Sequence, residues 1–166
     1  MKLDVSSILH TSGGILPFEF SLDMSGETFG SCQPVSEPVL CAGQVRNTAG
    51  VLVLTGSLRT TLHGVCDRCA KEFARAVNFP VEAVLARSLS NEDDCDPWTF
   101  LLDGECADLD EVMTTAFVLS MDSKFLCRED CQGLCPRCGK DLNDGPCGCR
   151  AEPDPRFAAL QKLLDP

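Results

Sequence analysis

Six cysteines lie within residues 127–149 and give this chain its strongest chemical signature. They follow the spacing C-x3-C-x3-C-P-R-C-x8-C-G-C. Two closely spaced pairs can present four thiolates to one ion, and soft sulfur ligands in a tetrahedron suit Zn²⁺ or iron. A glycine after the C-P-R-C segment permits the tight turn that directs backbone N–H groups at the sulfurs. The spacing therefore predicts a metal site, although it indicates no activity.

A further pair occurs in the tetrapeptide Cys66-Asp67-Arg68-Cys69, which we expect at the tip of a hairpin. A tight turn there would place both sulfurs on one side, as in a zinc knuckle. We predict one or two zinc ions. The first ligand set is Cys135, Cys138, Cys147 and Cys149, and the second is Cys66, Cys69, Cys127 and Cys131. In the alternative interpretation, the hairpin cysteines are turn thiols without a metal.

Other uses of the cysteines are less compatible with their context. The N-terminal residues contain no basic segment followed by an apolar one, so we expect a reducing cytoplasm, where clustered cysteines serve as ligands rather than as disulfides. The C-P-R-C-G segment is similar to half of a rubredoxin iron site, but its C-x-C partner is more typical of zinc ribbons. Thiol–disulfide catalysis usually places C-x-x-C at a helix N-terminus, whereas strands are expected on both sides of Cys66 and Cys69.

The elements that must position these sulfurs have alternating apolar patterns. In residues 51–65, Leu52, Leu54, Leu58 and Leu62 share one face, which is the period of a half-buried strand. Similar segments cover residues 15–22, 39–46 and 73–85, with Pro80 indicating a bulge or an edge. We predict an α+β fold in which an antiparallel β meander or partial barrel is covered by one amphipathic helix, followed by a C-terminal zinc-ribbon-like segment.

The covering helix is expected to begin at Asp108, an N-cap with Glu111 three residues later. Its buried stripe comprises Leu109, Val112, Met113, Ala116 and Phe117. We divide the chain into a core domain, residues 1–124, and a cysteine-rich tail, residues 125–166. A short final helix is predicted to open at Asp154-Pro155, with Phe157, Leu160 and Leu164 on its buried face.

The net charge of −11 constrains the partner. With 14 Lys and Arg against 25 Asp and Glu, long-range electrostatics disfavours docking on bare phosphate, whereas a basic protein suits the charge. Arg59, Arg68 and Arg75 are candidates for a small basic patch that contacts a partner. No apolar run approaches the ~20 residues needed to cross a bilayer. No nucleophile–base pair or phosphate-binding loop is recognisable, so we predict no catalytic residues and no small-molecule substrate.

Two segments carry a resemblance to a known family. Gly56-Ser57-Leu58 through Cys66-Asp67-Arg68-Cys69 and Phe73 resembles the central signature of the YceD family, bacterial and plastid proteins of large ribosomal RNA subunit accumulation. The run from Cys127 to Cys149 resembles the cysteine-rich tail of its Gram-positive-type members. The resemblance extends over about residues 40–160. It implies a non-enzymatic cytoplasmic protein that is needed for precursor or mature large-subunit rRNA to accumulate.

Three functional hypotheses remain at this point. The first is an adaptor or chaperone in ribosome biogenesis that contacts a basic ribosomal protein or assembly factor, either with or without a contact to large-subunit rRNA. The second is a zinc-ribbon regulator that binds nucleic acid directly, which would show a steep dependence on salt. The third is a thiol oxidoreductase.

Overall fold

The computed structural model describes residues 1–30, 32–88 and 97–149. Its main sheet contains five strands in the order β2 (Ile15–Leu22), β3 (Val39–Thr48), β4 (Val51–Val65), β5 (Glu72–Ala86) and β6 (Thr99–Leu101). The strands β2 to β5 form an antiparallel meander, as predicted. The short β6 pairs in parallel with the end of β5, so the sheet is mixed rather than purely antiparallel.

A smaller antiparallel sheet brings together two segments that lie far apart in the sequence. It pairs β1 (Lys2–Asp4) with β7 (Cys106–Asp108). A single helical turn, α1 (Ser6–Leu9), follows β1, and the carbonyls of Ile8 and Leu9 accept hydrogen bonds from Nδ2 of the buried Asn47. Asn47 thereby ties the N-terminal segment to the β3–β4 turn.

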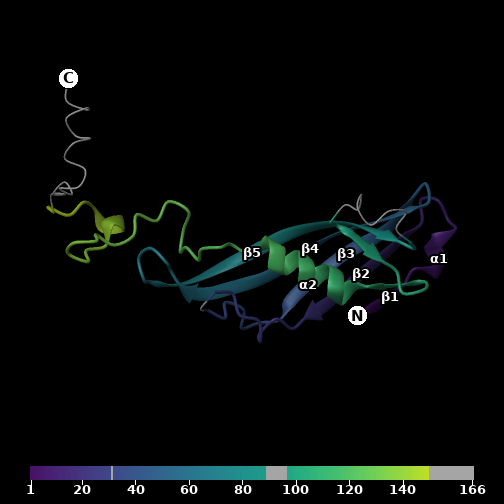
Figure 1. Cartoon of the computed structure of the whole chain (residues 1–166), viewed down its shortest axis with the longest axis horizontal. Coiled ribbons are helices and arrows are strands. Elements are labelled where there is room, and N and C mark those ends of the chain that lie inside the picture. The colour runs from purple at the N-terminus through teal and green to yellow at the C-terminus, as the bar shows by residue number, and fades with distance from the viewer. Residues whose placement is uncertain (31, 89–96, 150–166) are drawn as a thin grey trace, which may run out of the picture.

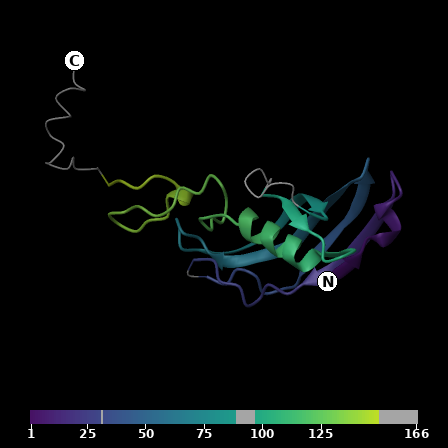
Figure 2. The same cartoon turned by 45° about the vertical axis from the view of Figure 1, so that its right-hand side comes forward.

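The helix α2 (Leu109–Ser120) lies across one face of the main sheet (Figures 1 and 2). Its N-cap is Asp108, whose carboxylate accepts from the backbone N–H groups of Asp110 and Glu111. The predicted stripe is buried along its whole length. At the end of that stripe, Phe117 meets Phe29 and Phe79 edge to face, with ring centroids 5.9 Å apart in both pairs. The predicted cap and covering face of the helix are therefore confirmed.

Alternation along β4 accounts for the core. The four leucines on its inner face are at most 3% exposed, whereas Arg59 and His63 on the opposite face are exposed. Pro80 pairs with Ser57 of β4, and β6 reaches β5 only at Val84–Ala86. Among the described residues, Pro80 thus has a strand on one side only, which is the edge position that its missing N–H favours.

The β4–β5 hairpin extends beyond the rest of the sheet as an arm. Pairing of β3 with β4 ends at Leu40 and Arg59, whereas pairing of β4 with β5 continues to Val65 and Glu72. Isolated contacts from Pro34 and Val35 reach β4 along this extension. The arm points toward the cysteine-rich segment, far from the N-terminus (Figure 1).

The predicted final helix at residues 154–164 lies outside the described residues. No described helix combines the length and apolar character that a membrane crossing requires.

Candidate metal centres

The arm ends in a tight turn that presents Cys66 and Cys69 on one side. The Cys66 N–H donates to the Lys71 carbonyl at 2.8 Å, and the Ala70 N–H donates to the Cys66 carbonyl at 2.9 Å. Ala70 adopts a left-handed conformation, with φ of 56°. These bonds close the turn between β4 and β5, so the two sulfurs of the pair are positioned by the sheet itself.

Hydrogen bonds at Asp67 bring the C-terminal segment to this turn. Its backbone N–H donates to the Phe125 carbonyl at 2.8 Å, and its carboxylate accepts from the Phe125 N–H at 2.7 Å. Cys127 and Cys131 follow directly after this contact. The guanidinium of Arg68 then donates to the Cys131 carbonyl at 2.9 Å. The chain is thus attached to the arm on both sides of Cys127.

Four sulfurs meet at this junction, which we call the arm cluster: Cys66, Cys69, Cys127 and Cys131. All of its Sγ atoms lie within 4.8 Å of one another. The Cys66–Cys131 and Cys69–Cys127 distances are 3.8 Å and 3.7 Å. Sulfurs bound at about 2.3 Å to one tetrahedral zinc ion would be about 3.8 Å apart, whereas disulfide sulfurs are only about 2.05 Å apart. The donor atoms therefore fit a tetrahedral ion.

The arm cluster is shielded from solvent. Cys66, Cys69 and Cys131 are only 2–4% exposed, and Phe73 and Leu126 pack against them.

A second group, the tail cluster, consists of Cys135, Cys138, Cys147 and Cys149, whose sulfurs also lie within 4.8 Å of one another. Its first pair repeats the turn of the arm. The Cys135 N–H donates to the Lys140 carbonyl at 2.8 Å, and the Gly139 N–H donates to the Cys135 carbonyl at 2.9 Å. Gly139 has φ of 71°, which glycine adopts without steric cost. Cys138 and Cys149 are exposed in this cluster.

The electrostatics of each cluster separates its thiols into those that ionise easily and those that do not. Burial opposes ionisation of Cys66, but backbone N–H groups of Cys127, Cys69 and Arg68 outweigh it and lower its pKa to about 6. Burial, followed by contacts with the other three sulfurs, raises the pKa of Cys127 to about 12. Four adjacent thiols cannot all carry charge unless a cation compensates them.

The tail cluster shows the same division. Backbone N–H groups of Cys138 and Arg137 lower the pKa of Cys135 to about 6. Its contact with Cys138, followed by burial and its contact with Cys147, raises the pKa of Cys149 to about 12. Cys131 of the arm cluster also has a lowered pKa. Burial opposes its ionisation, but hydrogen bonds to its sulfur outweigh this effect, and the largest contribution among them comes from the Asn143 amide.

The structure brings together the same two sets of four cysteines that the sequence indicates. It does not bring the three predicted arginines into one patch. Arg75 is paired across strands with the inward-facing Leu62 and forms an ion pair with Asp122 at 2.5 Å. Arg59 lies on the opposite face, and Arg68 is turned toward the Cys131 carbonyl. Among the three, Arg59 alone is exposed on the open face of the sheet.

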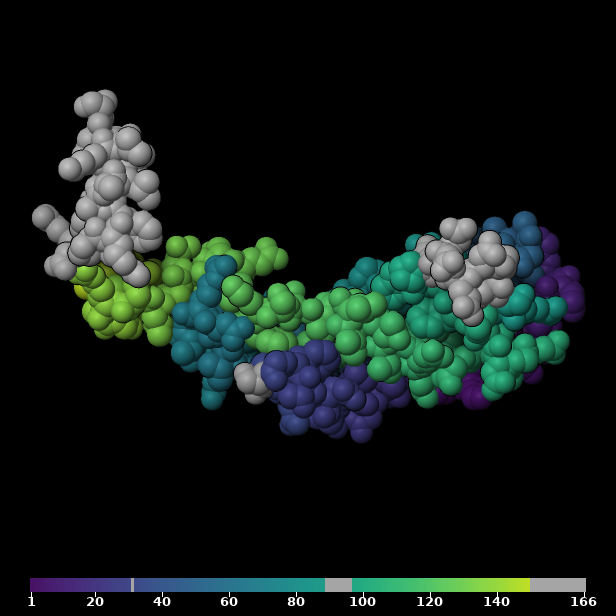
Figure 3. All heavy atoms as spheres, in the orientation of Figure 1, coloured from purple at the N-terminus to yellow at the C-terminus, as the bar shows by residue number. Residues whose placement is uncertain are grey.

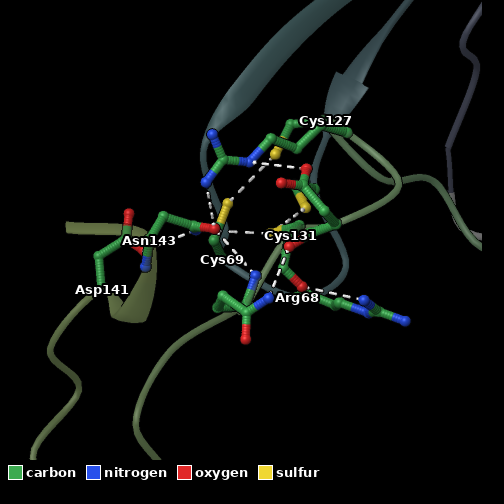
Figure 4. Close-up of polar contacts among 10 residues, drawn as sticks. Arg68, Cys69, Cys127, Cys131, Asp141 and Asn143 are labelled. Atoms are coloured by element: carbon green, nitrogen blue, oxygen red, sulfur yellow. Dashed lines mark hydrogen bonds and ion pairs between the residues drawn. The ribbon is translucent and has the colours of Figure 1, made fainter. Parts of the chain in front are cut away.

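Sequence reasoning missed the polar residues that hold the two clusters together. Lys71 forms an ion pair with Asp141 at 2.6 Å, and Asn143 lies beside Cys131 (Figure 4). A possible signal is the segment Asp141-Leu142-Asn143 between the two cysteine pairs of the tail, since Asp and Asn often form local turns.

This geometry can be compared with known proteins. The family described as "Large ribosomal RNA subunit accumulation protein YceD" matches residues 54–164, which include all eight clustered cysteines. The chain belongs to the YceD family. That family is named for rRNA accumulation and not for a catalytic activity.

Curated relatives include "Uncharacterized protein Rv2926c" of Mycobacterium tuberculosis (strain ATCC 25618 / H37Rv) and "Uncharacterized protein Mb2951c" of Mycobacterium bovis. Each is 33% identical to this chain over 120 residues, which is 70% of this chain and 57% of the relative. The chain thus spans little more than half the length of these relatives. No solved structure matches it significantly.

Proposed function

We propose that this chain is a non-enzymatic ribosome biogenesis factor that supports the accumulation or processing of large-subunit rRNA. The observation that carries the proposal is the family match, which spans the arm, α2 and both cysteine clusters. In this proposal the protein acts in the cytoplasm as an adaptor or chaperone, through contacts with a basic ribosomal protein or assembly factor and with rRNA.

We further propose that each cluster holds one zinc ion. The support is the number and spacing of the sulfurs, because four thiolates complete a tetrahedral site and leave no position for a substrate or water. Such sites are structural rather than catalytic. The arm cluster would join the core domain, residues 1–124, to the metal-binding tail, residues 125–166.

Charge supports a basic partner. Each zinc ion with four thiolates carries a net charge of −2, so two filled sites would change the formal net charge from −11 to about −15. A strongly acidic protein attracts basic proteins over a distance of about a Debye length, roughly 8–10 Å at physiological salt. Ribosomal proteins and many assembly factors are basic.

Arg59 is the best placed of the predicted partner-binding residues. It is exposed beside its cross-strand neighbour Leu40, which is 57% exposed, on the sheet face opposite α2. The two residues line a hollow of about 400 Å³ together with Glu37, Pro38 and Asn78. We propose this face as the contact surface, with Arg59 reaching a polar group of the partner or of rRNA.

The cellular test is depletion of the protein, followed by measurement of 23S-type rRNA and of large-subunit particles on sucrose gradients. We expect both to fall relative to small-subunit rRNA, and re-expression of the wild-type chain should restore them. Normal rRNA levels and normal particle profiles after depletion would contradict the proposed function.

The partner can be sought by affinity capture of the full chain from lysate, with and without ribonuclease. Recovery of a basic ribosomal or assembly protein that survives ribonuclease would support a direct protein contact, and an Arg59→Ala variant should reduce that recovery. Recovery that is lost entirely with ribonuclease would instead indicate contact through rRNA.

A further inference from the structure

Asn143 connects the two cysteine clusters. It belongs to a short 3-10 helix, Leu142–Asp144, in the loop between Cys138 and Cys147 of the tail cluster. Its side chain nevertheless points to the arm cluster, where Nδ2 donates to the sulfur of Cys131 at 3.5 Å (Figure 4). A residue carried by one candidate metal site thus contacts a ligand atom of the other.

The orientation of the Asn143 amide is fixed by its partners. Its Oδ1 accepts from the Gln132 N–H at 2.8 Å and from the Arg128 guanidinium at 2.7 Å, and both of these groups can only donate. Its Nδ2 faces the Cys131 sulfur and a carboxylate oxygen of Asp141 at 2.7 Å, which accept. Every hydrogen-bonding position of the amide is therefore used, and three of its four contacts hold the segment around Cys131.

The tail cluster determines where Asn143 lies. Residues 139–146 form a loop whose two ends, Cys138 and Cys147, meet in that cluster. Within the loop, Nζ of Lys140 donates to the Pro146 carbonyl at 3.0 Å. The Leu142 N–H donates to the carbonyl of Gly133, which precedes the tail cluster, at 2.9 Å. An ion that joins both ends of a loop removes many of its alternative conformations, so it would hold Asn143 against the arm.

Two further contacts join the segments that carry the two clusters. The Leu134 N–H donates to the carbonyl of Arg68, between Cys66 and Cys69, at 3.1 Å. Gly133 lies so close to that residue that an added Cβ would be 2.9 Å from the same carbonyl oxygen. In Figure 3 the described part of the tail, residues 125–149, packs directly against the end of the arm. The segments that carry the two clusters therefore pack against each other and are not independent modules joined by a linker.

We propose that the two clusters form one coupled binuclear unit, in which Asn143 is a positioning residue that directs the Cys131 thiolate toward the ion of the arm cluster. This inference rests on the proposed metal sites. Filling of the tail cluster fixes Asn143 and so tightens metal binding in the arm cluster. Because coupling between binding sites is reciprocal, filling of the arm cluster tightens binding in the tail by the same factor.

The test uses the whole 166-residue chain loaded with ¹¹³Cd²⁺, which gives a separate NMR signal for each four-sulfur site. Signals are assigned with Cys66→Ser and Cys149→Ser variants. In Asn143→Ala, we expect the NMR signal of the arm cluster to shift. We also expect the Cd²⁺ affinity of the arm cluster, measured by competition with a chelator, to fall about 10–100-fold, as is usual when a hydrogen-bond partner of a metal ligand is removed. The matched control is Asn78→Ala, because Asn78 is an exposed asparagine on β5.

Asn143→Asp separates the two contacts of Nδ2, to the Cys131 sulfur and to Asp141, from the two contacts of Oδ1. It keeps the oxygen that faces Gln132 and Arg128 but replaces the N–H donor with a negatively charged oxygen, so the arm-cluster affinity should fall at least as far as in Asn143→Ala. As a second route, Cys147→Ser combined with Cys149→Ser should weaken the arm cluster without altering any of its ligands.

If the NMR signal and the Cd²⁺ affinity of the arm cluster were unchanged in Asn143→Ala and in the Cys147→Ser, Cys149→Ser variant, the coupling would be overturned. The proposal of two metal sites in the wild-type chain would stand. A wild-type chain that binds no metal would overturn the proposed sites and the coupling together.

Discussion

The arm cluster and the tail cluster use the same local turn in different surroundings. Cys66-Asp67-Arg68-Cys69-Ala70-Lys71 and Cys135-Pro136-Arg137-Cys138-Gly139-Lys140 share the same pattern of backbone hydrogen bonds. The arm turn lies between two long strands, and its partner cysteines come from 58 and 65 residues further along the chain. The tail turn finds its partners within residues 147–149.

This difference teaches that one motif can serve two purposes. The arm cluster is buried and joins distant parts of the chain, so it determines tertiary structure. The tail cluster is partly exposed and closes a short loop, so it determines mainly local structure. Four predictions test this distinction, beginning with the largest expected effect.

Removing the sulfurs of the arm turn should detach the tail. Structural zinc sites in small peptides supply about 10–16 kcal/mol of apparent stabilisation. In Cys66→Ser combined with Cys69→Ser, we expect one metal ion per chain to be lost. Hydrogen exchange protection in residues 125–134 should disappear, while the sheet and the turn of the tail cluster stay protected. Metal analysis and exchange mass spectrometry measure both effects. The control is Cys32→Ser with Cys106→Ser, which removes two cysteines outside the clusters.

Metal removal should distinguish the clusters by exposure. Chelator attack on the tail cluster can begin at the exposed Cys138 or Cys149, whereas the arm cluster presents three sulfurs that are nearly inaccessible. We expect two phases of zinc release in a chromogenic chelator assay, with the tail cluster emptied first. The fast phase should be absent from Cys138→Ser. A fast phase that instead depends on Cys66 would reverse the comparison.

Asp67 tests the contact that places the tail on the arm. Asp67→Ala removes the acceptor for the Phe125 N–H, and we expect a loss of about 1 kcal/mol, because this carboxylate is partly open to solvent. The measurement is the opening free energy of tail amides by hydrogen exchange. Asp67→Asn retains an oxygen acceptor and should lose less. Equal losses in both variants would show that the charge of Asp67, rather than its hydrogen bond, matters.

The smallest effect concerns the residue after each turn. Gly139→Ala should destabilise the tail by about 1 kcal/mol, because its left-handed backbone disfavours a Cβ although the space around it is open. Ala70→Gly should change stability in the opposite direction, by between zero and about 1 kcal/mol. Gly148→Ala is the control, since an added Cβ there meets nothing and its backbone is not left-handed. Destabilisation by Ala70→Gly would mean that chain flexibility outweighs strain at this turn.

Local patterns explain why much of the fold is predictable. The expected bounds of β2 and β4 agree with the structure, because alternation over eight or more residues determines which face is buried. The cap at Asp108 likewise depends only on its neighbours in sequence. In contrast, β1, β6 and β7 have three residues each, which is too short for alternation to be recognised.

The candidate site divides in the same way. Grouping of the cysteines follows from their spacing and from the hairpin that carries Cys66 and Cys69. The arginine patch fails because the register pairs Arg75 with Leu62 and Arg59 with Asn78, which places the two arginines on opposite faces. The contact between Asn143 and Cys131 depends on how the tail docks, and no local pattern encodes it.

The position of the arm cluster in the chain has a consequence for the order of assembly. In the part of the chain that the structure describes, the strands of both sheets and the whole of α2 precede residue 121, whereas Cys127 and Cys131 are synthesised later. Because a nascent chain emerges N-terminus first, the hydrophobic core can form during translation, before the sulfurs that complete the cluster leave the exit tunnel. Capture of the proposed zinc ion would therefore be a late step, and a cell short of zinc would then accumulate a chain with a folded core and an undocked tail.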